Sequence, residues 1–177
     1  MNLISQLLYD SFKKNNKRIC LKIEDTEYTY EQLTNTSQIY ASLISYLNKK
    51  NKSSIAFIPA RDYSDYVTVL TSIFSGVSYT PINSNRGIEY LRKVINDLNT
   101  NIFFTGIKNY KSTKLLCQKL FKKKKYTIVI IDDKIKKLKS NEYNLIKIQN
   151  KKLNFKLSTK TINPIYTLFT SGTTGLP

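Results

Sequence analysis

Ser54-Ile55-Ala56-Phe57-Ile58 is a short, continuous apolar run, and it is the stretch that decides the predicted fold class. A strand buried on both faces has this pattern, which is typical of a parallel sheet covered by helices on each side. Directly after it, Asp62 can cap a helix that Gly76 ends, and residues 77–82 follow as a brief strand. The sequence therefore predicts a strand, a helix and a strand in close succession, which is the unit of a parallel sheet.

The same alternation continues on both sides of this unit. Apolar residues at helical spacing predict helices over residues 1–17, 31–47, 88–98 and 112–121, and β-prone runs predict strands over residues 19–23, 28–30, 101–105 and 126–131. The first helix is amphipathic and lacks the charged start and small-residue cleavage site of a signal peptide. We therefore expect an α/β fold of alternating βαβ units with a largely parallel sheet.

Residues 134–160 follow this alternation less clearly. They are rich in Lys and Asn, and their apolar residues are scattered. The pattern predicts either a surface excursion with a small hairpin or a disordered linker. Asn163-Pro164 then interrupts the chain before a final predicted strand.

Composition narrows the class of protein further. At 177 residues the chain fits one domain, and no run approaches the ~18 apolar residues that a transmembrane helix needs. Cys20 and Cys117 lie far apart and match neither a metal-binding nor a redox spacing. We therefore expect a reduced, cytoplasmic protein without a membrane span.

The net charge of +17 raises the possibility of a polyanion partner. Lys supplies 25 of the 29 basic residues, whereas a protein that reads bases or grips phosphates usually uses more Arg. The densest block, residues 122–125, falls at a predicted helix end, where cations oppose the macrodipole. The favoured interpretation is a solvated basic surface that binds no specific nucleic acid. The alternative is a non-enzymatic module that binds polyanions.

The end of the chain carries the strongest chemical signal. A β-prone run over residues 165–169 leads into a loop of hydroxyls and glycines, formed by Thr170, Ser171, Gly172, Thr173, Thr174 and Gly175. Glycines let the backbone approach an anion closely, and free N–H groups and hydroxyls supply donors. No Gly-Lys-Ser/Thr follows at the required spacing, so the loop is not a Walker A motif. The sequence therefore predicts a phosphate-binding loop of another kind.

Phe169-Thr170-Ser171-Gly172-Thr173-Thr174-Gly175-Leu176-Pro177 resembles the signature loop of the adenylate-forming superfamily. That group contains acyl- and aryl-CoA synthetases, luciferases, D-alanine–carrier-protein ligases and adenylation domains of nonribosomal peptide synthetases. Two upstream blocks, residues 29–33 (Thr-Tyr-Glu-Gln-Leu) and residues 74–83 (Phe-Ser-Gly-Val-Ser-Tyr-Thr-Pro-Ile-Asn), resemble family blocks in order and spacing. In the first block, Glu31 is interpreted as a residue of a helix start, where negative charge is favoured, and not as a catalytic group.

The resemblance implies a two-step reaction. A carboxylate attacks the α-phosphate of ATP to give an acyl-adenylate and pyrophosphate, and a thiol of coenzyme A or of a phosphopantetheinyl carrier protein then takes the acyl group. By this match Thr170, Ser171, Gly172, Thr173, Thr174 and Gly175 would contact the ATP phosphates, with Mg²⁺ supplying positive charge. Tyr79-Thr80-Pro81 favours amino-acid activation, whereas Asn83 is also compatible with an acyl-CoA synthetase.

The resemblance covers only the front part of the family's large N-terminal domain. We expect residues 1–177 to be an incomplete N-terminal portion of such an adenylation domain, because the family's loop lysine, magnesium-binding glutamate, ribose-binding aspartate and adenylation lysine would all follow residue 177. No catalytic residue and no metal ligand is therefore predicted in this chain. Alone it is expected to be inactive, as a fragment of a longer enzyme, a broken reading frame or an inactive remnant.

Overall fold

The computed structural model describes residues 3–48, 54–122, 124–132, 138–159 and 164–169. Their helices and strands follow one another as α1 (Leu3–Lys14), β1 (Ile19–Ile23), β2 (Thr26–Thr29), α2 (Tyr30–Leu47), β3 (Ile55–Phe57), α3 (Tyr63–Ser75), β4 (Tyr79–Pro81), α4 (Ile88–Asp97), β5 (Ile102–Thr105), α5 (Tyr110–Phe121), β6 (Thr127–Ile130), β7 (Glu142–Tyr143) and α6 (Leu145–Gln149). No helix in these described ranges is long and apolar enough to cross a membrane.

Five strands form a parallel sheet in the order β4-β3-β5-β6-β7. In its centre Ala56 of β3 lies opposite Thr80 of β4 and Phe103 of β5, and Phe103 lies opposite Ile128 of β6. Every residue of β3 and β5 is buried, as expected for strands covered on both faces. The predicted α/β fold with a largely parallel sheet is confirmed. The antiparallel pair β1–β2 forms a separate hairpin, in which β1 matches the strand predicted over residues 19–23 and β2 starts two residues before the strand predicted over residues 28–30.

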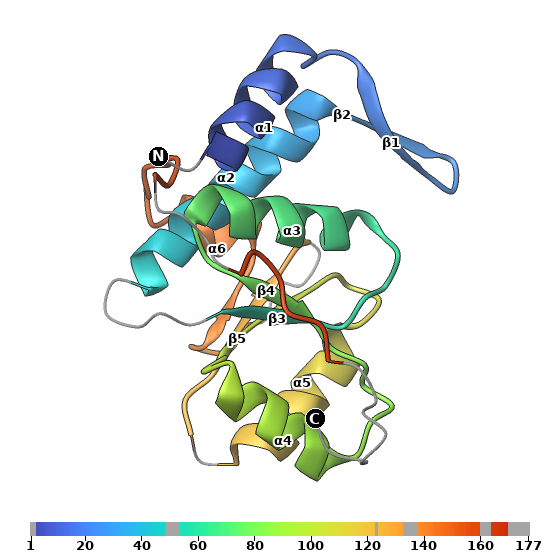
Figure 1. The fold of residues 1–177 in the computed structure, drawn as a ribbon, viewed down its shortest axis with the longest axis vertical. Coiled ribbons are helices and arrows are strands. Elements are labelled where there is room, and N and C mark those ends of the chain that lie inside the picture. Colours follow the sequence, from blue (N-terminus) through green and yellow to red (C-terminus); the bar gives the residue numbers. More distant parts are fainter. Residues whose placement is uncertain (1–2, 49–53, 123, 133–137, 160–163, 170–177) are drawn as a thin grey trace.

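Helices cover both faces of the sheet (Figure 1), with α1, α2 and α3 on one side and α4 and α5 on the other. Side chains alternate between the two sides along each strand, so Phe104 joins the core under α2 and α3 while its neighbour Phe103 joins the core under α4 and α5. Tyr40 and Phe74 are fully buried in the first core. Two separate hydrophobic layers therefore hold the sheet in place.

Local signals set the helix boundaries. Thr29 caps α2, because its hydroxyl accepts a hydrogen bond from the N–H of Gln32 while the Gln32 side chain accepts one from the Thr29 N–H. Glu31 lies in the first turn, so its predicted place at a helix start is confirmed. Asp62 caps α3, and Gly76 ends it at φ 72°, a conformation that favours glycine.

The predicted hairpin or disordered linker over residues 134–160 is wrong for the described part of that range. Residues 142–143 form β7, which adds to the parallel sheet beside β6, and α6 packs against α2. Leu153, Phe155 and Leu157 then point into the core under α1 to α3, while the residues between them are exposed. The sequence hides this arrangement because only three apolar residues, separated by Asn154 and Lys156, mark the run, and because the buried residue of β7 is Glu142.

Candidate functional site

In a parallel sheet the carboxyl ends of the strands meet at one edge, where α/β proteins bind their ligands. The segment 164–169 runs parallel to β4 through a bridge between Tyr79 and Tyr166. The Tyr79 N–H donates to the Ile165 carbonyl, and the Thr167 N–H donates to the Tyr79 carbonyl, both at 3.1 Å. In the described residues 164–169 the final predicted strand is thus reduced to one isolated bridge at Tyr166, which lies beside β4. It directs Phe169 toward the carboxyl edge of the sheet.

A cleft of about 250 Å³ lies at this edge, between the ends of β3 and β4, helix α4 and the segment 164–169. Its described lining consists of Pro59, Pro81, Ile82, Asn83, Arg86, Tyr90, Leu91, Val94, Leu168 and Phe169. The volume is below the range of about 300–1,000 Å³ that is typical of pockets for small molecules. We therefore interpret the described lining as one wall of a ligand site and not as a complete pocket.

The polar side of the cleft comes from the turn after β4. The Arg86 N–H donates to the Asn83 carbonyl at 3.2 Å, and the Asn85 N–H donates to the Asn83 side-chain oxygen at 3.0 Å. The Arg86 guanidinium lies over the Tyr90 ring, 5.8 Å from its centre. Arg86 is the charged residue of the described lining, so the cleft suits an anion better than a cation.

A second possible site is the crevice between β3 and β5, because the chain adds β4 on one side of β3 and then β5 on the other. Side chains and loops fill this crevice. A Cβ atom on Gly106 after β5 would lie 2.7 Å from the Ser64 hydroxyl and 3.0 Å from the Asp62 carboxylate. The Asn109 amide donates to the Ile58 carbonyl at 3.1 Å and joins the two loops. The cleft on the β4 side is therefore the better candidate.

Asp65 fixes the loop that leads into α3. Its carboxylate accepts the Ala60 N–H at 2.9 Å and the Arg61 N–H at 2.7 Å, and Arg61 takes a φ of 54°. Burial raises the pKa of Asp65, and the hydrogen bonds from Arg61 and Ala60 act against this rise. The hydrogen bonds to Asp65 thus fix the loop that contributes Pro59 to the cleft.

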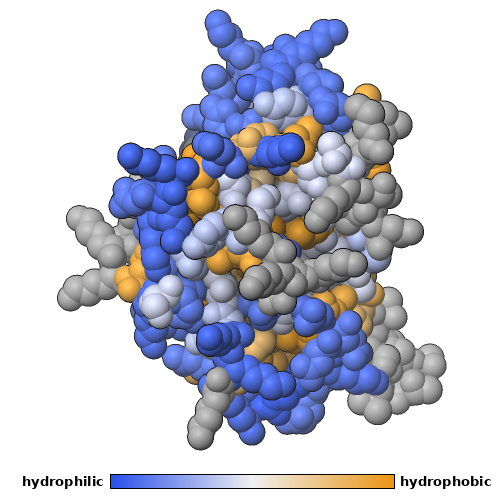
Figure 2. Space-filling model, turned by 90° about the vertical axis from the view of Figure 1, so that its left-hand side faces the viewer, coloured by the Kyte–Doolittle hydropathy of each residue, from blue (hydrophilic) through white to orange (hydrophobic). Residues whose placement is uncertain are grey.

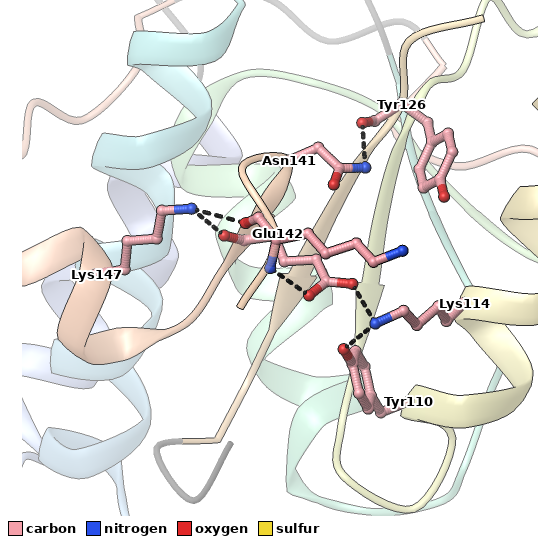
Figure 3. A network of polar contacts seen from close by, with 7 residues as sticks. Tyr110, Lys114, Tyr126, Asn141, Glu142 and Lys147 are labelled. Carbon is pink, nitrogen blue, oxygen red and sulfur yellow. Dashed lines mark hydrogen bonds and ion pairs between the residues drawn. The ribbon is translucent and has the colours of Figure 1, made fainter. Parts of the chain in front are cut away.

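The opposite edge of the sheet carries a second polar cluster (Figure 3), which is closed. The Lys114 ammonium lies 2.8 Å from the carboxylate of Glu142, whose side chain is 1% exposed, and it donates to the Tyr110 hydroxyl at 2.8 Å. The Lys139 N–H donates to the other carboxylate oxygen at 2.8 Å. Burial alone would raise the pKa of Glu142, but these hydrogen bonds and the Lys114 charge outweigh it, so the pKa is lowered. The cluster serves to attach β7.

Lys147 completes this cluster. Its ammonium donates to the backbone carbonyls of Glu142 at 2.6 Å, Lys139 at 3.1 Å and Ser140 at 3.2 Å. It also lies over the Tyr143 ring, 4.5 Å from its centre. Burial and the charge of Lys151 lower the pKa of Lys147. Its three donors are engaged with backbone carbonyls, so we assign Lys147 a structural role and not a ligand-binding one.

The predicted phosphate-binding residues Thr170, Ser171, Gly172, Thr173, Thr174 and Gly175 lie outside the described residues. Within the described ranges, no group of three or more His, Cys, Asp or Glu side chains could hold a metal ion. The block 74–83 ends α3, forms β4 and lines the cleft, whereas the block 29–33 only begins α2. Sequence reasoning did not identify Pro59 and Arg86 as lining residues, because the cleft forms only when separate loops meet.

Comparison with known proteins agrees with this fold. The family model described as AMP-binding enzyme matches residues 8–177, so the chain belongs to this family of adenylate-forming enzymes. It is 28% identical over 177 residues to the D-alanine--D-alanyl carrier protein ligase of Staphylococcus haemolyticus, covering 100% of this chain and 31% of that protein. It is 26% identical over 174 residues to a mycosubtilin synthase polypeptide of Bacillus subtilis, covering 98% of this chain and 6% of that protein.

A solved structure shows the same fold. The red-emitting luciferase of Phrixothrix hirtus superposes with a TM-score of 0.77 at 16% identity, covering 98% of this chain and 44% of the luciferase. The chain spans less than a third of the length of either curated relative that it matches.

Proposed function

We propose that residues 1–177 are the first part of the large domain of an AMP-forming ligase, which activates a carboxylic acid with ATP and passes the acyl group to a thiol. The observation that carries the proposal is the parallel bridge between Tyr166 and Tyr79, which brings Phe169 to the edge of the sheet where α/β proteins bind ligands. Membership of the AMP-binding family supports the same reaction class.

In this proposal the loop 170–175 holds the phosphates of ATP through backbone N–H groups and hydroxyls. Such donors stabilise the charge that develops on the departing pyrophosphate, and they fix the α-phosphate for attack. Bound Mg²⁺ would add positive charge. The described residues offer no cluster of acidic ligands for that ion, so no step is assigned to it here.

An amino acid is the proposed substrate, and the thiol of a phosphopantetheinyl carrier protein is the proposed acceptor. Tyr79-Thr80-Pro81 supports this choice, as does the relationship to a D-alanine--D-alanyl carrier protein ligase. An acyl-CoA synthetase, with coenzyme A as acceptor, is the second candidate, and Asn83 in the cleft lining is compatible with it.

Nuclear magnetic resonance on residues 1–177 tests the phosphate loop directly. Titration with tripolyphosphate should shift the amides of residues 170–175 with a dissociation constant in the millimolar range, about −4 kcal/mol. The double variant Ser171→Ala/Thr173→Ala should abolish these shifts, whereas Thr159→Ala, an exposed hydroxyl outside the loop, should leave them unchanged.

Two results would contradict the proposal. Shifts confined to amides beside surface lysines, with none in residues 170–175, would favour the polyanion-binding module instead. Micromolar affinity of residues 1–177 for ATP would show that this portion binds the nucleotide without the rest of a ligase, against the proposed inactivity of the portion alone.

A further inference from the structure

Residues 150–159, which we call the strap, connect the two edges of the sheet. They begin after α6, beside β7, and the chain next appears as the segment 164–169 beside β4 at the opposite edge (Figure 1). On its way the strap passes α1 and the C-terminal end of α3. Its placement therefore bears on where the segment 164–169 can lie.

Ser158 in the strap is held from two sides. Its N–H donates to the Phe74 carbonyl near the end of α3 at 2.8 Å. Its carbonyl accepts a hydrogen bond of 3.2 Å from the hydroxyl of Ser5, which is 1% exposed and belongs to α1. Ser5 also precedes the residues 8–177 that the family model matches.

An aromatic cluster reinforces this junction. Tyr9 of α1 packs edge-on against Phe74 of α3 with ring centres 5.8 Å apart, and it lies 6.1 Å from the ring of Phe155 in the strap. Phe74 and Phe155 are 6.2 Å apart. Three elements therefore meet at one cluster, and aromatic pairs of this kind add stability beyond the area that they bury.

The two anchor points of this chain lie on one continuous run. Phe74 binds the strap, and Tyr79, a short way further along, binds Ile165 and Thr167 of the segment 164–169. An extended chain from Ser158 to Pro164 spans at most about 22 Å. Holding Ser158 against α3 therefore limits the positions from which the segment can reach β4.

We propose that α1 is a clasp that holds the strap on the end of α3 and thereby positions the segment 164–169 on β4, with Ser5 and Tyr9 as positioning residues. The Ser5 hydroxyl attaches α1 to the backbone of the strap, and the Tyr9 ring attaches α1 to the aromatic cluster. The idea rests on the proposed function only for the identity of the loop that follows Phe169. The contacts that define the clasp stand without it.

Amide hydrogen exchange on residues 1–177 without nucleotide tests the clasp. Ser5→Ala removes a hydrogen bond and should speed exchange of the Thr167 amide about fivefold. The Ile131 amide, which donates to Thr105 in the sheet, should change by less than about twofold. Ser11→Ala, an exposed serine on the same helix, is the matched control and should leave both amides unchanged.

Tyr9 gives an independent variant pair. Tyr9→Leu removes the ring and should speed exchange at Thr167 about tenfold. Tyr9→Phe keeps the ring and loses only the hydrogen bond that the Tyr9 hydroxyl accepts from the Gln38 amide at 3.2 Å, so it should change this exchange by less than about twofold. Unchanged exchange at Thr167 in both Ser5→Ala and Tyr9→Leu, or an equal rise at Ile131, would overturn the proposal. Because no phosphate is present, the result is independent of the tripolyphosphate titration, and either can fail alone.

Discussion

At one edge of the sheet, β7 adds two residues to β6, and one of them is Glu142, a charged side chain that is 1% exposed. At the other edge, the segment 164–169 adds one bridge to β4 and stacks Tyr166 on Tyr79, with ring centres 5.8 Å apart. The first edge is thus fixed by an ion pair whose carboxylate is buried, within a hydrogen-bond network. The second edge is held by backbone pairing and one ring contact, and Tyr166 itself is 53% exposed. On the face of the molecule that Figure 2 shows, hydrophilic side chains dominate and hydrophobic ones are visible in smaller areas between them.

This difference teaches how each edge can respond to change. Substitution of one partner of an ion pair with a buried carboxylate lowers stability strongly, because it leaves the other charge unpaired in a poorly solvated place. A half-exposed ring contact contributes less and can shift with little cost. We therefore expect the β7 edge to be rigid and sensitive to substitution. We expect the 164–169 edge, which leads toward the proposed phosphate loop, to depend on anchors elsewhere.

Breaking the ion pair should give the largest effect. Lys114→Met leaves Glu142 buried without its cation, and we expect a loss of about 3–5 kcal/mol in the free energy of unfolding, measured by urea denaturation at pH 7. The double variant Lys114→Met/Glu142→Met should recover most of this loss. Lys111→Met, an exposed lysine on the same helix, should change stability by less than about 0.5 kcal/mol. A loss from Lys114→Met as small as that of the control would show that water solvates Glu142.

Changing pH should weaken the same edge by a smaller amount. Glu142 has a pKa below its ordinary value of 4.5, so its contribution is complete above that value and is lost as the pH falls toward the lowered pKa. The hydrogen bonds to Glu142 and Tyr110 raise the pKa of Lys114 above 10.5, so its contribution is complete below that value and is lost as the pH rises through the raised pKa. Protonation costs less than Lys114→Met, because neutral Glu142 carries no unpaired charge.

Urea denaturation across pH 3–10 measures this dependence. The parent should show a plateau between the two ordinary values and lose stability on the acid side, and the variant Lys114→Met/Glu142→Met should show a weaker acid loss. Identical acid profiles for the two proteins would mean that other carboxylates govern the pH dependence.

The smallest effect is expected at the other edge. Tyr166→Ala removes the ring that stacks on Tyr79 and should cost about 0.5–1.5 kcal/mol. A double-mutant cycle with Tyr79→Leu isolates the coupling between the rings. Tyr66→Ala, a tyrosine of α3 with a similar exposed fraction of 45%, should cost less than the Tyr166 variant. Equal losses from the two alanine variants, with no coupling in the cycle, would remove the ring contact from this account.

The central strands could be predicted because their signal is local. Residues 55–57 and 102–105 are buried on both faces, so each forms an uninterrupted apolar run that needs no knowledge of its neighbours. β7 could not be predicted, because Glu142 becomes a core residue only where Lys114 reaches it from α5. Charge usually marks a solvated position, and here pairing reverses that rule.

The candidate site shows a similar division. The block 74–83 is recognisable in the sequence, and the structure places part of it in the cleft lining. Arg86 and Pro59 enter the same lining from loops after β4 and β3, and their meeting depends on strand order, which no local pattern records. The loop 170–175 remains a prediction from its residues and its resemblance.

Lys147 gives the lysine-rich composition a different meaning at one position. Three backbone carbonyls surround its single nitrogen, which matches the three diverging N–H bonds of a tetrahedral ammonium. A guanidinium is planar and spreads its donors over a fork, so arginine could not satisfy the same three oxygens from one point. Lys147 is thus fixed by the shape of its head group, unlike an exposed lysine such as Lys111, and Lys147→Arg is therefore not a conservative change.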